Sequence, residues 1–458
     1  MESTSADWIT IPIAAWSRVA GNIRRGSIIL VAGYPGAGKT TLASQFAYAG
    51  AASGEPSLYV SFVEPRDDFI DNAASFGMDF RPLEERGAFK YYEALSVSDP
   101  EALGDVIEDV LSQVDSMGAK RVVLDSVTAV EQLARDPPRA REIMHSALYL
   151  GLKRRGATSL LIAELPFGAE ASPIGPEEFI ADGVIVLKYR VVKNKLERYA
   201  EIRKMRGTNI KRSEFPIAVT SRGLEIAVPP DISSMPSGAS PARSFSLLGF
   251  RLPEGANVLI DVEPSVDPLK LTAWLLASPA LNSGLKVMVK SFIHGPSTLR
   301  DMIEACHVED YGNRLALPAY EPSSYSVGEL LSVAFRGIEE FRPDVVIEEG
   351  NSVLMELFGR EDYTKLAYDC LSFMGANRVL TFHIYLWPTD NVFDLPLARF
   401  YDFVFTVKPV GEAIEIRPLK LWGKVSPGQP VTVSLRQLSS CDYTRQNGLR
   451  PAGSPQQV

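Results

Sequence analysis

The chain has 458 residues, of which 46% are hydrophobic and 22% charged, and its formal net charge is −9. This composition predicts a globular protein of about two to four domains and argues against a generally basic protein that coats nucleic acid, although a local basic patch stays possible. The start of the chain has no leader-like pattern, no apolar run is long enough to span a bilayer, and the three cysteines suggest neither a metal site nor a disulfide scaffold, so we expect a cytoplasmic protein with no membrane partner.

The first predicted strand, residues 27–32, leads into a glycine-rich loop, and a predicted helix over residues 42–49 follows. The residues between them are Gly33, Tyr34, Pro35, Gly36, Ala37, Gly38, Lys39, Thr40 and Thr41. They match G-x-x-x-x-G-K-[ST] in the context that a phosphate-binding loop requires, which argues against a chance glycine turn that carries a lysine. Backbone N–H groups of such a loop approach the phosphates, Lys39 reaches the β- and γ-phosphates during catalysis, and the Thr40 hydroxyl can ligate Mg²⁺. We therefore predict that all of these residues bind a nucleoside triphosphate.

Three later strands carry an acid at their carboxyl ends. The strands are predicted at residues 57–64, 121–126 and 158–164, and their acids are Glu64, Asp125 and Glu164. Helices predicted at residues 66–76, 99–116 and 141–154 alternate with them, and the sheet continues at 183–187 and 198–205. Alternating strands and helices predict an α/β fold with a mostly parallel sheet covered on both faces. Ligands bind at the carboxyl ends of such strands, where the three acids fall.

Each acid has a predicted role and an alternative. We expect Asp125 to hold Mg²⁺, directly or through water, because a buried acid otherwise needs a partner. Glu64 is the candidate for the base that orients the attacking water, and its alternative is a solvated loop acid. Glu164 stands where a polar residue can sense the γ-phosphate, whereas Asp182 is expected to be structural.

Residues 227–243 are rich in Pro, Ser and Gly and predict a linker between a first domain, residues 1–226, and a second, residues 244–436. The second domain repeats the order of the first at residues 257–260, 286–289, 344–349, 378–383 and 415–423, which predicts an internal duplication. The loop after Ile260 has acids but no glycine and no Gly-Lys-Thr, so we expect no ordinary nucleotide site there. We expect His294 and His383 at the positions of Glu64 and Glu164. Residues 437–458 predict a flexible tail.

Four blocks together resemble the KaiC-like branch of the RecA superfamily of ATPases. The blocks are residues 33–41, 59–65, 121–129 and 204–208. The resemblance covers residues 10–226 well and residues 244–436 as a degenerate copy. It implies two RecA-like P-loop NTPase domains in tandem, with mostly parallel sheets flanked by helices and with the second domain degenerate. It also implies ATP and Mg²⁺ as ligands and a homo-oligomeric ring, possible sizes including a hexamer, with the nucleotide between subunits.

The same resemblance implies that Lys204 and Arg206 contact the γ-phosphate of the neighbouring subunit, where a cation would stabilise the charge of the transition state. The alternative is a strand with two outward cations. The sequence departs from the family at Val63-Glu64, where KaiC-type domains usually carry two adjacent glutamates. We therefore expect slow hydrolysis of ATP to ADP and phosphate.

Taken together, these patterns predict an oligomeric, nucleotide-dependent switch or scaffold, with a second domain that serves assembly or binds a regulatory protein. Two alternatives stay open. Basic residues at 190–198 and 203–212 allow a RadA- or RecA-related accessory ATPase in DNA recombination or repair, although interspersed acids and few aromatics do not indicate a nucleic-acid site. Val63 allows a nucleotide-dependent binding module without turnover.

Overall fold

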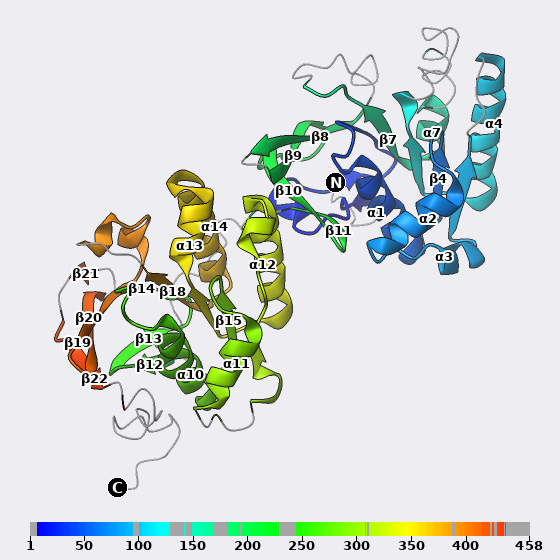
Figure 1. Ribbon diagram of the computed structural model, residues 1–458. Coiled ribbons are helices and arrows are strands. Elements are labelled where there is room, and N and C mark those ends of the chain that lie inside the picture. The colour runs from blue at the N-terminus through cyan, green and yellow to red at the C-terminus, as the bar shows by residue number, and fades with distance from the viewer. Residues whose placement is uncertain are drawn as a thin grey trace. The chain divides into compact units, whose positions relative to one another are not determined.

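A computed structural model of the chain describes residues 7–94, 100–128, 142, 149–168, 181–192, 195–226, 228, 244–306, 308, 311–386, 391–421, 424–425, 428–434 and 436 (Figure 1). The chain divides into two compact units, Met1–Val228 and Pro229–Val458. Apart from Val228, the linker expected at 227–243 lies outside the described residues, as does the tail expected at 437–458. No helix in the described part of the chain is long and apolar enough to cross a membrane.

Within the described residues, the main sheet of the first unit has nine strands in the order β11-β10-β9-β8-β3-β7-β6-β4-β5. They are β3 (Ile28–Gly33), β4 (Ser57–Ser61), β5 (Phe89–Glu93), β6 (Arg121–Asp125), β7 (Thr158–Glu164), β8 (Gly183–Val192), β9 (Lys195–Met205), β10 (Glu214–Thr220) and β11 (Gly223–Ile226). Neighbours from β5 to β8 pair in parallel, and β9, β10 and β11 extend the sheet antiparallel. The mostly parallel sheet predicted from the sequence is therefore confirmed.

The helices of the first unit follow the predicted alternation. They are α1 (Lys39–Ala52), α2 (Arg66–Ser75), α3 (Arg81–Glu85), α4 (Pro100–Met117) and α7 (Leu150–Arg155). Of the helix predicted over 141–154, only residue 142 and residues 149–154 lie within the described ranges. Short pieces precede the sheet: β1 (Trp8–Ile9), η2 (Trp16–Arg18) and β2 (Ile23–Arg24). Among the boundaries that differ from the prediction, one affects a candidate site residue: β4 ends at Ser61 rather than at residue 64, so Glu64 lies in the turn that follows.

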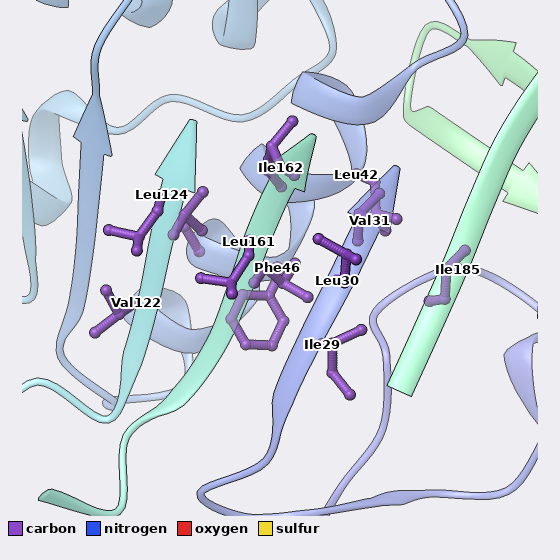
Figure 2. Close-up of a cluster of buried hydrophobic side chains, with 14 of the residues drawn as sticks. Ile29, Leu30, Val31, Leu42, Phe46, Val122, Leu124, Leu161, Ile162 and Ile185 are labelled. Carbon is purple, nitrogen blue, oxygen red and sulfur yellow. The ribbon is translucent and has the colours of Figure 1, made fainter. Parts of the chain in front are cut away.

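The central strand β3 explains why the sheet is covered on both faces. All its residues are buried, and they alternate between the two faces because successive side chains of a strand point in opposite directions. Figure 2 shows Ile29, Leu30 and Val31 of β3 among apolar side chains from α1, β6, β7 and β8. A strand that is apolar on both faces is typical of a parallel sheet between two layers of helices.

The second unit repeats this topology. Its sheet runs β16-β15-β17-β18-β14-β19-β20-β21, and β22 also pairs with β20. The strands are β14 (Asn257–Val262), β15 (Val287–Ser291), β16 (Leu315–Ala316), β17 (Val345–Glu349), β18 (Leu380–Leu386), β19 (Phe403–Val410), β20 (Ala413–Leu421), β21 (Lys424–Val425) and β22 (Val431–Ser434). With β14 in the place of β3, the order β16-β15-β17-β18-β14-β19-β20 corresponds to β5-β4-β6-β7-β3-β8-β9. The tandem α/β architecture predicted from the sequence is confirmed.

Helical segments and one further pair of strands complete the second unit. The helices are α9 (Pro268–Lys270), the π-helical η5 (Leu271–Ala277), α10 (Ser278–Asn282), α11 (Pro296–Glu304), α12 (Val327–Phe341), α13 (Asn351–Phe358) and α14 (Arg360–Ala376). The strand pair is β12 (Ser244–Leu247) with β13 (Phe250–Pro253). Cys306 is disulfide-bonded, and Cys370 is a buried free thiol.

Strand register identifies which residues of the two units correspond. Ser61 lies opposite Asp125, as Ser291 lies opposite Glu349. His294 therefore follows β15 at the same offset at which Glu64 follows β4, as expected. Gly33 lies opposite Glu164, however, and Val262 lies opposite Leu386. The match between His383 and Glu164 was wrong, because the partner of Glu164 in the second unit is Leu386.

His383 instead belongs to a buried polar row that crosses three strands. Lys290, Glu348 and His383 lie side by side in register, and none is more than 5% exposed. The first unit has Val60, Leu124 and Leu161 in the same row. An apolar row of the first unit is thus replaced by a charged one in the second.

Electrostatics explains how this row is tolerated. The Lys290 ammonium donates to Glu348 Oε1 at 3.0 Å. Burial opposes both charges, but their mutual attraction prevails: it raises the pKa of Lys290 and lowers that of Glu348. Burial lowers the pKa of His383, so its ring is neutral at pH 7. His383 Nδ1 lies 3.5 Å from Glu348 Oε2, and within the described residues neither ring nitrogen has a hydrogen-bond partner.

The buried row generates a prediction about stability. Lys290→Met is expected to lower the free energy of unfolding of the second unit by about 3–5 kcal/mol, because Glu348 is left charged and unpaired in the interior. The triple variant Lys290→Val, Glu348→Leu and His383→Leu reproduces the row of the first unit and should be at least as stable as the unchanged chain. Denaturant unfolding of the full chain measures both. A triple variant less stable than Lys290→Met would contradict this account.

Candidate functional site

The loop between β3 and α1 needs its glycines for different reasons. A Cβ on Gly33 would overlap the carbonyl oxygen of Leu187 on β8, so only glycine fits there. Gly36 and Gly38 have φ angles of 74° and 102°, in the left-handed region that favours glycine. Gly38 is also the N-cap of α1. The loop therefore ends directly at a helix N-terminus, where backbone N–H groups and the helix dipole favour an anion.

Lys39 is the first residue of α1 and is 5% exposed. Its Nζ atom donates to the Tyr34 carbonyl oxygen at 2.9 Å and to Glu164 Oε2 at 2.9 Å. Glu164 ends β7 beside Gly33, and its side chain is 41% exposed. The ammonium is thus held at the carboxyl edge of the sheet by one neutral and one charged acceptor, and an incoming phosphate would compete with the carboxylate.

Asp125 ends β6 next to this lysine and accepts two hydrogen bonds on one oxygen. Thr40 Oγ1 donates to Asp125 Oδ2 at 3.0 Å, and the Tyr59 hydroxyl donates to the same oxygen at 2.7 Å. Burial raises the pKa of Asp125, while these two donors and the charge of Lys39 act in the opposite direction. A hydroxyl and a carboxylate this close form an oxygen-rich donor set of the kind that Mg²⁺ prefers, so these residues fit the ion.

Glu64 is positioned by a turn rather than by a strand. Ser61 Oγ accepts from the backbone N–H groups of Val63 at 3.3 Å and of Glu64 at 2.9 Å. Asn72 on α2 donates to Glu64 Oε1 at 2.7 Å. Burial is the largest cause of the raised pKa of Glu64, and the Asn72 hydrogen bond opposes it. The Val63 side chain beside it is 62% exposed.

These groups surround one cavity of about 1240 Å³ at the carboxyl edge of the sheet. Its lining includes the loop residues Pro35, Gly36, Gly38, Lys39, Thr40 and Thr41, and the acids Glu64, Asp68, Asp125 and Glu164. The other loop residues, Gly33, Tyr34 and Ala37, are buried behind the cavity. The structure therefore places the glycine loop, Glu64 and Asp125 around one cavity at the carboxyl edge of the sheet, where the sequence predicted that the acids fall.

Sequence reasoning gave three residues at the site no role in nucleotide binding. Tyr59 and Asn72 contact the two acids, and Arg198 lines the cavity with its Nε 3.5 Å from the Gly36 carbonyl oxygen. The alternation of side chains along β4 could have placed Tyr59 on the same face as Ser61. Asn72 and Arg198 depend on how α2 and β9 pack, which no local pattern gives.

Lys204 and Arg206 lie away from this cavity. Leu187 pairs with Gly33 on β3 and with Ala200 on β9, whereas Lys204 pairs with Val184. Val184 in turn pairs with Leu30, so Lys204 lies three residues, roughly 10 Å, along the strands from the phosphate loop, and Arg206 lies farther toward the amino end of β3. The Arg206 side chain is 61% exposed and lies 3.7 Å from Asp182 Oδ1.

The basic hairpin of β8 and β9 carries many cations, but acids pair with several of them. Lys188 and Arg203 both contact Glu201, at 3.1 and 3.2 Å, and Arg190 contacts Glu197 at 2.9 Å. These ion pairs neutralise part of the positive charge that a nucleic-acid backbone would need.

The corresponding place in the second unit has a different interior. Asp267 in the loop after β14 caps α9 by accepting from the Leu269 backbone N–H at 3.0 Å. Glu349, in the position of Asp125, is fully buried and contacts Thr272, Ser291 and His294 at 3.3, 2.5 and 3.1 Å. Its carboxylate is thus satisfied inside the protein. No group of three or more His, Cys, Asp or Glu side chains that could hold a metal ion occurs within the described residues of either unit.

Comparisons with known proteins agree with this geometry. A family model described as "ATPase: KaiC" matches residues 13–231. The circadian clock oscillator protein KaiC of Parathermosynechococcus lividus is 36% identical over 220 residues, which are 45% of this chain and 39% of that protein. KaiC of Rippkaea orientalis is 32% identical over 314 residues, 66% of this chain and 55% of that protein. A UPF0273 protein of Pyrococcus horikoshii is 33% identical over 221 residues, 44% of this chain and 87% of that protein. The matched region thus spans from about two fifths to just over half of these two clock proteins.

The contact between Lys39 and Glu164 generates a prediction about nucleotide affinity. Glu164→Gln should bind ATP several-fold more tightly in the absence of metal, by about 1 kcal/mol, because the phosphates no longer displace or face a charged carboxylate. Titration of a fluorescent ATP analogue in EDTA measures this. The matched control is Glu197→Gln, which removes a carboxylate of the same domain that pairs with Arg190 and should leave affinity unchanged. Weaker binding by Glu164→Gln would instead identify this side chain as a favourable contact of the nucleotide.

Proposed function

The chain belongs to the KaiC family of ATPases, and we propose that its first domain binds Mg-ATP beside residues 33–41 and slowly hydrolyses it in a homo-oligomer. The observation that carries this proposal is the assembly of Lys39, Thr40 and Asp125 around one cavity, at the end of a glycine loop that leads into a helix. A chance glycine turn would have no reason to face a buried acid across the sheet.

Different groups of the site would bind the phosphates and the metal. Backbone N–H groups at the start of α1 would bind the phosphate chain, and Lys39 would exchange its carboxylate partner for phosphate oxygens. Thr40 and Asp125 would hold the metal between them. Bound Mg²⁺ supplies positive charge that offsets the charge of the phosphates.

Glu64 would orient the attacking water and accept its proton. The Ser61 turn and the Asn72 amide fix its position, and burial raises the pKa of Glu64, which makes its carboxylate a better proton acceptor. Val63, which stands where relatives of the KaiC type usually carry a second glutamate, leaves Glu64 without that neighbour. We therefore propose slow turnover.

Lys204 and Arg206 would act on the nucleotide of a neighbouring subunit. Their place along the strands, away from the cavity, keeps them from the phosphate loop of their own chain. A cation supplied in trans stabilises charge at the γ-phosphate and couples hydrolysis to assembly. A ring, with a hexamer as one possible size, satisfies this requirement for every subunit.

The output of this cycle would be conformational: a nucleotide-dependent switch or scaffold, located in the cytoplasm. The second domain would serve assembly or bind a regulatory protein, since its acid at the position of Asp125 is engaged by internal donors. The alternative of a DNA recombination accessory gains no support from the hairpin of β8 and β9, whose cations are partly paired. The alternative of a binding module without turnover rests on Val63.

Two substitutions separate binding from turnover. Lys39→Ala should abolish ATP binding, whereas Glu64→Gln should bind ATP normally and release phosphate about 10²–10⁴ times more slowly, because it lacks the base. Asp68→Asn is the matched control, as it alters another acid of the same cavity and should keep phosphate release within a few-fold. Unchanged phosphate release by Glu64→Gln would remove its assignment as the base.

A mixing experiment tests the action in trans. Lys39→Ala and Arg206→Ala should each be inactive alone, yet a one-to-one mixture should regain activity. Random assembly gives about one interface in four that combines an intact loop with an intact arginine. Phosphate release from the mixture, compared with each variant alone, measures this, and light scattering with and without Mg-ATP confirms that subunits mix. Lack of any recovery in a mixed oligomer would contradict the role of Arg206.

A further inference from the structure

Tyr59 is a buried tyrosine whose hydroxyl contacts a residue of the proposed metal site. It lies on β4 and is 1% exposed. Its hydroxyl donates to Asp125 Oδ2 at 2.7 Å, and Thr40 Oγ1 donates to the same oxygen at 3.0 Å. Within the described residues, both protein donors of this carboxylate therefore bind one oxygen, which leaves the other oxygen for an incoming ligand.

A second tyrosine occupies the neighbouring strand. Tyr91 on β5 pairs directly with Tyr59 in the sheet, and the two rings stack with centroids 5.5 Å apart and planes 11° apart. The Tyr91 hydroxyl donates to the carbonyl oxygen of Glu64 at 2.8 Å. Phe69 packs against both rings, with its ring centroid 4.4 Å from that of Tyr59 and 4.7 Å from that of Tyr91. The two hydroxyl groups are thus held by one rigid aromatic cluster and reach two different parts of the site.

We infer that Tyr59 is a positioning residue for the metal ligand Asp125, and that Tyr91 positions the turn that carries Glu64. This inference rests on the proposed function, because it assigns Asp125 to the metal and Glu64 to the water. A carboxylate at the end of a strand can rotate about its last bond, and a donor fixed on Oδ2 stops that rotation. Thr40 alone cannot do so as well, because its oxygen also belongs to the proposed metal site.

The stacked pair offers a matched test, since Tyr59→Phe and Tyr91→Phe remove the same atom from neighbouring rings. In a first titration, the full chain binds a fluorescent ATP analogue in EDTA, which gives the metal-free nucleotide affinity. In a second, Mn²⁺ is added in the presence of a saturating non-hydrolysable ATP analogue, and free Mn²⁺ is followed by electron paramagnetic resonance. Tyr59→Phe should keep its metal-free nucleotide affinity within about twofold and lose about tenfold in Mn²⁺ affinity, as expected for a hydrogen bond to a charged group. Tyr91→Phe should keep both affinities and lose phosphate release.

The outcomes separate this inference from the proposed function. Unchanged Mn²⁺ affinity in Tyr59→Phe would overturn the inference while leaving nucleotide binding in place. Equal loss of metal-free nucleotide affinity and Mn²⁺ affinity would also overturn it, because a merely structural role predicts that result. The Mg²⁺ concentration that half-saturates phosphate release gives a second measure, and it should rise in Tyr59→Phe and not in Tyr91→Phe. If the wild-type protein bound no nucleotide, the proposed function would be overturned, and with it this inference.

Discussion

The central strand β3 is the constraint on which the first domain depends. It pairs in parallel with β7 and β8, is buried on both faces, and ends at a glycine whose missing side chain lets β8 approach. Because parallel strands end at one edge, this pairing delivers the phosphate loop, Glu164 and Asp125 to the same place. Donors from other elements reach both acids: Lys39 contacts the exposed Glu164, and Thr40 with Tyr59 offsets the cost of burying Asp125. The register of β3 with its neighbouring strands therefore determines both the packing of the sheet and the positions of the site residues.

The sequence was sufficient for those parts of the fold and site that depend on local pattern. The glycine loop, the acids after apolar strands and the repeated order of strands all predicted features that the structure contains. Features that depend on register were missed or misplaced. Glu64 lies in a turn because β4 ends at Ser61, and His383 aligns with Leu161 because pairing between β17 and β18 fixes its row. Tyr59 was missed because its partner is more than sixty residues away in the chain, on another strand.

The two domains show how one topology can hold two kinds of interior. In the first, an apolar row of Val60, Leu124 and Leu161 supports the sheet below an open cavity, and the polar groups gather at its edge. In the second, Lys290, Glu348 and His383 fill the same row, and Glu349 at the edge is engaged by hydroxyl groups and an imidazole. A buried ion pair contributes little net stability compared with apolar side chains. A need for stability therefore does not explain the charged row of the second domain. A requirement for one specific conformation of that domain explains it better.

The position of Lys204 and Arg206 away from the nucleotide cavity of their own chain bears on how subunits would assemble. The cavity of the first domain has the glycine loop, the proposed metal ligands Thr40 and Asp125 and the proposed base Glu64, whereas the cations Lys204 and Arg206 lie away from it along the same sheet. Charge at a γ-phosphate is stabilised only by groups that reach it, so within one chain these cations serve no nucleotide. If neighbouring subunits supply them, hydrolysis reports whether the neighbour is present and correctly placed. The slow turnover proposed for Glu64 would fit such an assembly, because a long-lived ATP-bound state would give a partner protein time to bind the assembled form.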